Sequence, residues 1–475
     1  MNSFLNKIKF NWIFYIGLAL LIRLFFPSLS LYSYFAILIS LHQILNLFNS
    51  FGVIIPIRYI FGTFMCLQMF IGPVFQYNGL DKFVFSFYSM KVPEDVYFSY
   101  VIPAVICFIV GLHIRTEKFN GELLDENRIK EFSEKNPDLA LIFIGVGFFA
   151  SVFSTIIPTD FSTTEAVGQR GGGGWIFFIL YLIGCLKYIG AFLLILGKSK
   201  MKTVTIVVVY GSIIATSLGT GMFHDLLTWI IMLAAILAIR YKPSIYIKII
   251  FAFCFIILAF VIQIVKDNYR TALWQGGGNS GLATFAQAAE QSESSNDVFD
   301  IKSLALSNVR INQGYIITNI MKTVPEKVPF ANGEELGQIL EAAFLPRVLA
   351  PDKLEAGDQK IFNQYTGLGI TKATMGLSSV GDAYINFGII GGSIFMFFLG
   401  FLYNEILKGF YRYSKNFPVL LLFTPLVFYF PIRPDSELQT NLGHVVKSTF
   451  LILIIFTVWK SNLQLQFSRK LNKED

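Results

Sequence analysis

Long apolar runs separated by short polar segments dominate the chain. A helix needs about 20 apolar residues to cross the hydrocarbon of a bilayer, and backbone that faces lipid must satisfy its hydrogen bonds within the segment. The pattern therefore predicts an all-α polytopic membrane protein with about 12 transmembrane helices. The expected spans are 10–26, 29–49, 52–75, 96–113, 138–158, 174–196, 203–221, 223–240, 247–265, 380–403, 418–431 and 442–459.

One segment, 266–378, departs from this pattern because it is mostly polar and holds shorter amphipathic stretches. In EELGQILEAAF, for example, Leu336, Ile339 and Ala343 recur at helical spacing and would form one apolar face. We therefore expect one large outer loop domain that contains amphipathic helices. The expected organisation is transmembrane helices 1–9 in 1–265, the loop domain in 266–378, transmembrane helices 10–12 in 379–460 and a tail in 461–475.

Basic residues indicate how these spans are oriented. Lysines and arginines gather in the segments that face the cytoplasm if the N-terminus does, whereas the short outer loops hold only Lys82, Lys91, Arg170 and Arg433. Cytoplasmic loops of membrane proteins carry the excess of positive charge. Both termini are therefore expected in the cytoplasm, which puts 266–378 on the outer side.

Composition agrees with this class and removes others. With 54% apolar residues, 15% charged residues and a mean hydropathy of +0.59, the chain could not form an ordinary soluble surface. The net charge of +7 is dispersed over short loops, so we expect no nucleic acid partner. Cys66, Cys107, Cys185 and Cys254 all fall inside apolar runs and suit packing rather than a disulfide framework.

Charged residues near the spans are the first candidates for chemistry, because an ion in hydrocarbon is costly. Arg23 and Arg58 lie near span ends and suit anchoring at the interface. Lys187 lies midway along the sixth span, where a structural ion pair and a ligand role are both open. His444 and Lys447 share a helical face at the start of the last span and could line a cavity.

Three outer arginines suit a ligand that carries phosphate, since a planar guanidinium can hold two oxygens of a phosphate at once. Arg170 precedes GGGGW, Arg270 follows the ninth span, and Arg347 lies in the proline-bounded LPRVLAP. The sequence contains no P-loop, dinucleotide fingerprint, His-Glu-x-x-His motif or clustered metal ligands. We therefore expect neither a metal ion nor another cofactor.

The stretch SSVGDAYINFGIIGGSIFMFFLGFLYNEI, 378–406, resembles the O-antigen polymerase (Wzy-type) family of bacterial oligosaccharide repeat-unit polymerases, in which a similar run opens a span after a long outer loop. LPRVLAPDK, 345–353, is similar to a Pro-Arg…Pro-x-Lys element of that loop, and Phe362 and Asn363 follow it. The resemblance implies a metal-independent glycosyltransferase in the bacterial cytoplasmic (inner) membrane, with the large loop in the periplasm. Such an enzyme polymerises oligosaccharide repeat units into O-antigen, capsule or exopolysaccharide.

The implied substrate is an oligosaccharide linked to undecaprenyl pyrophosphate and presented at the outer leaflet. Pyrophosphate leaves readily if its developing charge is stabilised, and Arg170, Arg270 and Arg347 would supply that charge. Lys353 would add a point charge. The implied partners besides the lipid bilayer are a chain-length regulator and a flippase.

The attacking sugar hydroxyl needs a base to accept its proton, and Asp382 is the first candidate. Glu165 and His444 are the alternatives. The remaining candidate substrate-binding residues are Lys353, Tyr384, Asn386 and Asn363. Structural roles are equally open for Asp382 as a helix cap, for Asn386 in hydrogen bonds between helices and for Tyr384 in an interfacial aromatic belt.

Three other functions share this membrane setting. An O-antigen ligase would use the same donor but transfer the glycan to a different acceptor, and the sequence barely separates it from a polymerase. A lipid-linked oligosaccharide flippase would carry polar residues through the full thickness of its helices, whereas here they concentrate on the outer side. A scaffold would have no need of arginines at three span mouths.

Overall fold

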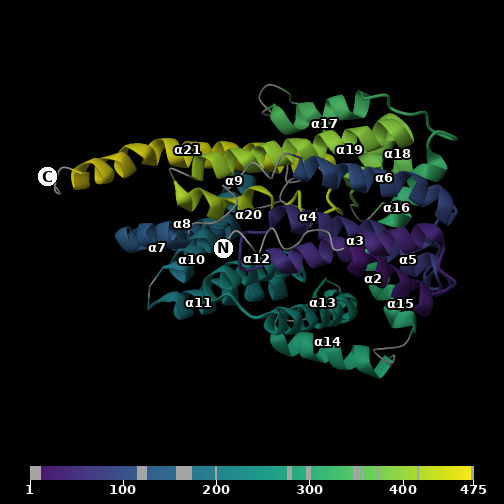
Figure 1. Cartoon of the computed structure of the whole chain (residues 1–475), viewed down its shortest axis with the longest axis horizontal. Coiled ribbons are helices and arrows are strands. Elements are labelled where there is room, and N and C mark those ends of the chain that lie inside the picture. The colour runs from purple at the N-terminus through teal and green to yellow at the C-terminus, as the bar shows by residue number, and fades with distance from the viewer. Residues whose placement is uncertain are drawn as a thin grey trace.

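The computed structural model describes residues 12–114, 126–156, 174–197, 200–274, 281–295, 301–345, 350, 353–354, 357–371, 375–414 and 417–471. Within these ranges the regular secondary structure is helical, and they contain no strand (Figure 1). This confirms the all-α class that the apolar runs predict.

The helices follow the apolar runs closely. The first part of the chain forms α2 (Trp12–Phe25), α3 (Leu31–Ser50), α4 (Ile57–Cys66), η1 (Leu67–Ile71), α5 (Gly72–Tyr77), η2 (Leu80–Phe83), η3 (Ser86–Tyr88), α6 (Glu94–His113), α7 (Glu126–Lys135), α8 (Pro137–Ile156), α9 (Gly174–Gly184), α10 (Leu186–Leu196), α11 (Lys202–Thr220), α12 (His224–Tyr241) and α13 (Ile245–Trp274). The second part forms α14 (Leu282–Ser295), α15 (Ile301–Ile311), α16 (Gly314–Thr323), α17 (Glu334–Phe344), α18 (Gln359–Thr366), α19 (Ser378–Ser414), η5 (Pro418–Phe423), α20 (Thr424–Val427) and α21 (Leu438–Leu471).

Nine of the described helices are long and apolar enough to cross a membrane, and a tenth results if the bent pair Asn127–Lys135 and Asp138–Ser154 counts as one span. The expected first and eleventh spans correspond to shorter apolar helices, Tyr15–Phe25 and Pro418–Val427. The structure is thus that of an all-helical, membrane-associated protein. The full set of twelve crossings stays a prediction.

Contacts sort the ends of the helices into two groups. At one end, Tyr429 donates a hydrogen bond to Asp225, which lies in the first turn of α12. At the other, Arg58 donates to Asn404 over 2.8 Å, and Asn404 donates to the carbonyl of Ile114 over 2.9 Å. Helices that alternate in direction produce this pairing of ends. The first end also holds Asp382 and is called the pocket end, after the pocket described below. The second is called the Arg58 end.

Helices α6 and α19 lie side by side along much of their length (Figure 1). Gly111 and Gly400 lie at this contact, where a Cβ on Gly400 would overlap the carbonyl oxygen of Phe108 and a Cβ on Gly111 would overlap that of Phe397. Small residues allow the backbones of membrane helices to approach this closely. The pair α6 and α19 therefore forms a rigid support that connects both ends of the molecule.

Helix α19 is interrupted at Gly388, which has φ 65° and ψ −157°. Only glycine adopts this backbone conformation without strain. The interruption separates a short segment, 378–387, from the longer remainder of the helix. The short segment carries the start of the stretch that resembles the polymerases, including Asp382 and Asn386.

Helices from 266–378 pack against the bundle rather than apart from it. Nearly all of α16 is buried, and it contacts α5, α6, α18 and α19. Gly381 allows this, because a Cβ there would lie 2.7 Å from the side chain of Ile320. Helix α17 lies along α21 and α19 (Figure 1). The loop helices thus form walls over the pocket end.

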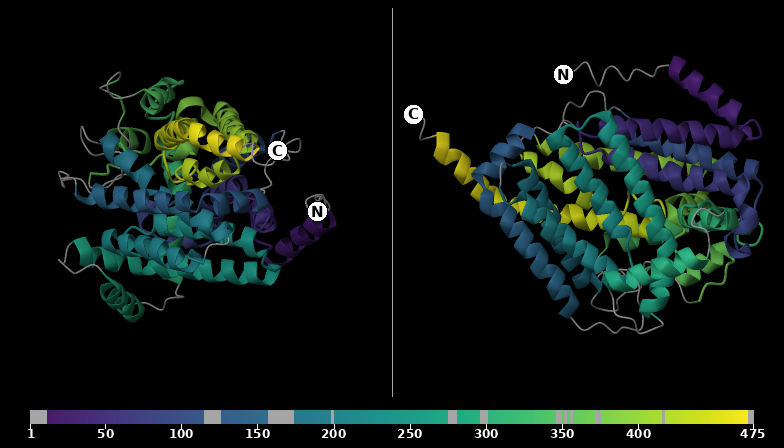
Figure 2. Two further views of the ribbon diagram at one scale, coloured as in Figure 1. Left: turned by 90° about the vertical axis from the view of Figure 1, so that its left-hand side faces the viewer. Right: turned by 90° about the horizontal axis from the view of Figure 1, so that it is seen from below.

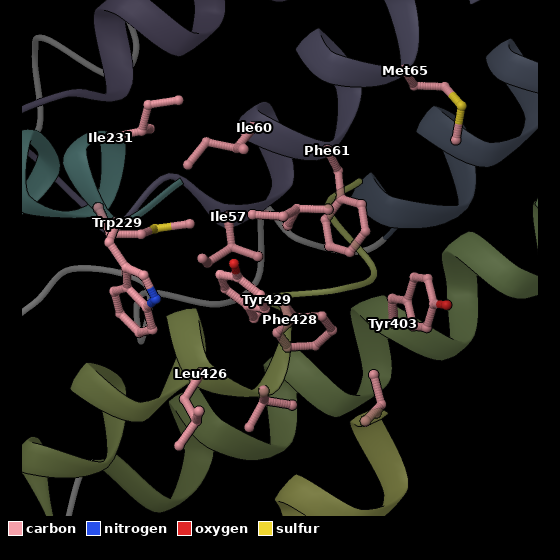
Figure 3. Packing of buried hydrophobic residues seen from close by; sticks show 14 of the residues in the cluster. Ile57, Ile60, Phe61, Met65, Trp229, Ile231, Tyr403, Leu426, Phe428 and Tyr429 are labelled. Atoms are coloured by element: carbon pink, nitrogen blue, oxygen red, sulfur yellow. The ribbon is translucent and has the colours of Figure 1, made fainter. Parts of the chain in front are cut away.

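Aromatic residues fill the centre of the bundle (Figure 3). Trp229 of α12 lies between the rings of Tyr188 and Tyr429, with centroids 3.9 Å and 5.7 Å away. Phe428 packs against Phe61 of α4 at 5.7 Å. By contrast, α2 lies at the edge of the bundle, and α21 extends beyond the other helices toward the C-terminus (Figure 2). The core therefore lies between α4, α12, α19 and the segment 424–429.

Candidate functional site

A pocket opens at the pocket end, where α17, α18, the short segment of α19 and the start of α21 meet. The space between its lining residues is about 470 Å³ when the open solvent at its mouth is included, so only a small part of it is enclosed. The lining residues are Glu335, Ile339, Leu354, Asp358, Ile361, Phe362, Tyr365, Met375, Leu377, Asp382, Ile385, Asn386, Glu437 and Gln439. Four of these are carboxylates, and among the described residues no lysine or arginine lines the pocket. The site therefore places four acids on a wall that is otherwise mainly apolar.

Asp382 lies in this wall with only 6% of its surface exposed. One carboxylate oxygen, Oδ2, accepts a hydrogen bond of 3.0 Å from the backbone N–H of Leu438, the first residue of α21. The N–H groups of a first helical turn lack partners within the helix and favour a negative charge. The second oxygen, Oδ1, accepts no hydrogen bond from the described residues. Asp382 therefore caps one helix and retains an oxygen that can accept a proton or a hydrogen bond.

Glu437 immediately precedes α21 and forms the next part of the wall. Its Oε1 accepts hydrogen bonds from the Gly357 N–H at 2.8 Å and from the Thr440 hydroxyl at 2.9 Å. Burial raises the pKa of Glu437, and the neighbouring carboxylate of Asp358 raises it further, while the two donors oppose the shift. The two hydrogen bonds fix Oε1 of Glu437, and the carboxylate of Asp358 is near enough to affect the pKa of Glu437.

Glu335 and Asp358 complete the set of acids from two further elements. The Tyr365 hydroxyl donates to Oε1 of Glu335 over 3.0 Å, and burial raises the pKa of Tyr365 with Glu335 adding to the effect. Asp358 is the N-cap of α18 and accepts from the Lys360 N–H at 2.8 Å. Across the described part of the chain, no group of three or more His, Cys, Asp or Glu residues is arranged to hold a metal ion. The carboxylates face a pocket but do not converge on one point.

Asn386 lines the same pocket and binds two segments of backbone. Its Oδ1 accepts from the Leu336 N–H in α17 at 3.1 Å, and its Nδ2 donates to the Asp382 carbonyl at 2.9 Å. Both contacts hold the pocket walls together, as in the structural alternative considered from the sequence. The pocket thus brings Asp382 and Asn386 together and assigns each of them a contact in the fold.

Three other predicted residues lie near this site without lining it. Tyr384 is buried between the rings of Tyr100 and Phe330, with centroids 5.0 Å and 5.8 Å away. Asn363 donates to the carbonyl of Ile370 at 2.8 Å and accepts from its N–H at 2.7 Å, which closes the loop after α18. Lys353 donates to the carbonyls of Ala342 and Leu345 at the C-terminal end of α17. These contacts position walls and loops.

Two predicted residues lie away from the pocket. Arg270 donates from Nε to the carbonyl of Gly221 over 3.0 Å, at the end of α11. His444 is buried, its Nε2 lies 2.7 Å from the carbonyl oxygen of Leu426, and its ring packs against that of Phe430 with the centroids 4.9 Å apart. Because a carbonyl oxygen only accepts, Nε2 carries the proton. Arg170, Glu165 and Arg347 lie outside the described residues.

A pair of opposite charges adjoins the pocket in the loop before α21. The Arg433 guanidinium lies 3.2 Å from Oδ2 of Asp435 and keeps the pKa of Asp435 below its usual value although burial alone would raise it. A Cβ on Gly376 would lie 2.8 Å from the Asp435 carbonyl oxygen and 3.1 Å from the Glu437 N–H nitrogen. Gly376 thus lets the loop pack closely against the segment that leads into α19.

Three acids that line the pocket are not among the residues predicted from the sequence: Glu335, Asp358 and Glu437. Acids on polar segments usually belong to solvated surfaces, so their identity alone gives no signal. Two weak signals are present. Asp358 and Glu437 each directly precede a helical pattern, where acids favour the N-terminus of a helix. Only the packing of α17 and α18 against α19 shows that the acids share a pocket.

Comparison with known proteins gives a family but no activity. No curated protein and no solved structure matches the chain. Residues 151–460 match the family described as a domain of unknown function, DUF8712. The matched region spans more than half of the chain and includes all the residues that line the pocket. The chain therefore belongs to the DUF8712 family.

Proposed function

We propose that this protein is a membrane glycosyltransferase that polymerises oligosaccharide repeat units linked to undecaprenyl pyrophosphate, as O-antigen polymerases do. One observation carries the proposal. The motif that resembles those enzymes forms the wall of a pocket, and its carboxylate, Asp382, keeps one oxygen without a donor from the described residues. A buried carboxylate in this arrangement is suited to accept a proton from a bound hydroxyl.

The proposed reaction is a single displacement between two lipid-linked units. The hydroxyl oxygen of the acceptor sugar forms a bond to the anomeric carbon of the donor, while the bond from that carbon to the pyrophosphate oxygen breaks. The electron pair of the broken bond leaves with undecaprenyl pyrophosphate. The hydroxyl proton passes to the Asp382 carboxylate. The Leu438 N–H holds that carboxylate in position, and Asn386 donates to the backbone carbonyl of Asp382.

The donor pyrophosphate needs positive charge beside an acidic pocket, and Arg347 remains our first candidate. The described residues on both sides of it belong to the pocket, since α17 provides Glu335 and Ile339 and the following segment provides Leu354. Lys353 ties this segment to the end of α17. Arg270 does not line the pocket and donates to the Gly221 carbonyl at the end of α11.

The proposal includes an orientation. With twelve crossings and both termini in the cytoplasm of a bacterium, the pocket end faces the periplasm, where lipid-linked units are presented. Ser294 and Ser414 lie at opposite ends in this arrangement. In a background without cysteines, a membrane-impermeant thiol reagent should label Ser294→Cys in intact spheroplasts and leave Ser414→Cys unlabelled. The reverse labelling pattern would contradict the orientation.

The decisive experiment supplies the purified full chain, in lipid nanodiscs, with defined lipid-linked repeat units and no other acceptor. A polymerase extends these units into longer lipid-linked chains and releases undecaprenyl pyrophosphate. A ligase requires a different acceptor and would leave the chain length unchanged until that acceptor is added. A flippase would leave the chain length unchanged with or without that acceptor. Failure to extend units of any tested composition by well-folded protein would overturn the proposal.

A further inference from the structure

Helix α17 is too short to cross a membrane, yet it lies beside two helices that are long enough. It has 11 residues, whereas a crossing needs about 20. A Cβ on Gly333, the residue before α17, would lie 3.6 Å from the ring of Phe387 in α19. A Cβ on Gly443 in α21 would lie 3.9 Å from Cα of Ala343, near the other end of α17. Both ends of α17 therefore lie against candidate membrane spans rather than beyond them.

The surface of α19 next to α17 is apolar and exposed. Phe387 contacts the start of α17 and is 37% exposed, and Ile390 and Ile394 follow it at 77% and 53%. Large exposed apolar side chains on a helix of this length are those that lipid covers. The lipid-facing surface of α19 therefore extends to the first turn of α17.

Helix α17 has a second apolar face in addition to the buried one. Ile339, Ala342 and Ala343 are buried, and the helix contacts α21 and α19 (Figure 1). Leu340 and Phe344 lie four residues apart on one side of the helix and are 39% and 56% exposed. We call these two residues the apolar flank. Because the bundle is already covered by the buried face, the apolar flank needs another partner.

The remaining face of α17 is acidic. Glu334 and Glu341 are both exposed and lie seven residues apart, which places them on one side of the helix. We call them the acidic flank. A helix at a membrane interface keeps its charged residues in water and its apolar residues at the boundary of the acyl chains. The two flanks of α17 have this division.

Lys447 indicates the depth of this region. It follows Gly443 by one helical turn in α21, and its ammonium lies 3.7 Å from the position of a Cβ on Gly443 and 4.9 Å from the ring centroid of Phe178. The side chain therefore extends back toward the start of α21. Lysines near the end of a span extend in this way to keep their charge at the interface. The contact of Ala343 with Gly443 places the C-terminal end of α17 at the same level.

We propose that α17 is embedded in the interface of the bilayer at the pocket end, with its apolar flank against phospholipid acyl chains and its acidic flank in water. Part of the segment expected to form an outer loop domain is then a membrane element. Because α17 donates the Leu336 N–H to Asn386 and brings Glu335 to the pocket, the bilayer supports one wall of that pocket. This inference does not depend on the proposed function, and chain extension can succeed or fail with either outcome.

Spin labels on the full chain test the inference. In a background without cysteines, nitroxide labels are attached to Leu340→Cys and Phe344→Cys on the apolar flank and to Glu334→Cys and Glu341→Cys on the acidic flank. The protein is placed in phospholipid nanodiscs that contain no polyprenyl lipid. Oxygen concentrates among acyl chains and a polar nickel chelate stays in water, so the ratio of their collision rates with each label reports its surroundings. We expect this ratio to be several-fold higher on the apolar flank than on the acidic flank.

A label at Phe450→Cys is the lipid-facing reference, because Phe450 is 64% exposed on α21. Ratios at Leu340→Cys and Phe344→Cys that match this reference, in monodisperse samples, would support the inference. High nickel accessibility at all four positions of α17 would place the helix in water and overturn it. Labels on the apolar flank that neither reagent reaches, with dipolar broadening that unlabelled protein removes by dilution, would show that a second copy covers the flank and would also overturn it.

Discussion

Each end of α19 lies at a buried charged group, but the surroundings of the two groups differ. At the Arg58 end, the guanidinium of Arg58 donates to Asn404 at 2.8 Å and lies over the ring of Tyr411, 5.3 Å from its centroid. Asn404 in turn donates to the Ile114 carbonyl. At the pocket end, Asp382 bonds to one backbone N–H and borders empty space. The first charge is enclosed by its partners, whereas the second faces a pocket.

The comparison separates charges that hold the fold from charges that can act on a ligand. Both sites carry a cost of desolvation, which for Arg58 is offset by contacts within the protein. The four carboxylates of the pocket accept hydrogen bonds, but no lysine or arginine lines the pocket with them among the described residues. Substitution at the Arg58 end should therefore change the amount of folded protein, and substitution at the pocket end should change the chemistry.

The largest expected effect follows from the loss of the proposed base. Asp382→Asn keeps an oxygen that can accept from the Leu438 N–H, so the fold should persist. It cannot accept the proton, and polymer formed per unit of folded protein should fall by about a hundred- to ten-thousandfold. The measurement is chain extension in nanodiscs, normalised to monodisperse protein. Wild-type extension by Asp382→Asn would remove Asp382 from the reaction and leave it a helix cap.

The next effect tests the support that both ends share. Gly400→Ala adds a Cβ that overlaps the Phe108 carbonyl oxygen, a backbone atom that cannot move aside without separating α6 from α19. Overpacking of this kind costs about 1–3 kcal/mol. Gly409→Ala on the same helix is the matched control, because nothing lies within 4 Å of its Cβ. Thermal unfolding followed by size-exclusion chromatography should show a lower Tm for Gly400→Ala only, and equal Tm values would contradict the close packing of these helices.

A smaller effect tests the enclosed charge at the Arg58 end. Asn404→Ala removes the acceptor of the Arg58 guanidinium and the donor to Ile114, which should destabilise the fold by about 1–3 kcal/mol. Asn404→Asp keeps the acceptor and should lose less. Polymer per unit of folded protein should equal that of the wild type in both variants. A specific loss of activity in Asn404→Ala would show that the Arg58 end has a functional role, and would contradict the distinction drawn between the two ends.

Helix positions were predictable from the sequence because the thickness of a bilayer sets the length of an apolar run. The expected spans 29–49 and 96–113 correspond to α3, Leu31–Ser50, and α6, Glu94–His113. The expected span 418–431 differs, since it forms the 3-10 helix Pro418–Phe423 and the short α20. Pro425 explains this in part, because it lacks the N–H that the interior of a continuous helix over 418–431 would need. Apolar composition alone does not distinguish such a segment from a full crossing.

The site was predictable only where a residue belongs to a recognisable local pattern. Asp382 and Asn386 stand out because they share the motif that includes Gly388, whose positive φ requires glycine. The position of Arg270 beside Gly221 has no such signal, since a guanidinium on a span end looks the same whether it meets a carbonyl or a ligand. Glu335 and Glu437 lie about a hundred residues apart and meet only through tertiary packing.

The smallest expected effect concerns two acids in the loop before α21 whose pKa values shift in opposite directions. Burial raises the pKa of Glu437 above its ordinary value of 4.5. Burial also acts on Asp435, but the charge and hydrogen bond of Arg433 outweigh it and lower the pKa of Asp435 below 3.8. Because the Asp435 side chain is 34% exposed, solvent screens this pair and limits its contribution.

The two shifts predict opposite pH dependence of stability. The folded protein binds the Glu437 proton more tightly than the unfolded chain, so its stability relative to Glu437→Gln should fall as pH rises from 4.5 through the raised folded pKa. Asp435 stabilises the fold above its ordinary value of 3.8, and that stability should be lost as pH falls through the lowered folded pKa. Tm measured against pH for the wild type, Glu437→Gln and Asp435→Asn checks both signs. If removal of Glu437 leaves the pH profile between pH 4.5 and neutrality unchanged, then water reaches this carboxylate freely, and the acids of the pocket end are no more costly than surface charges.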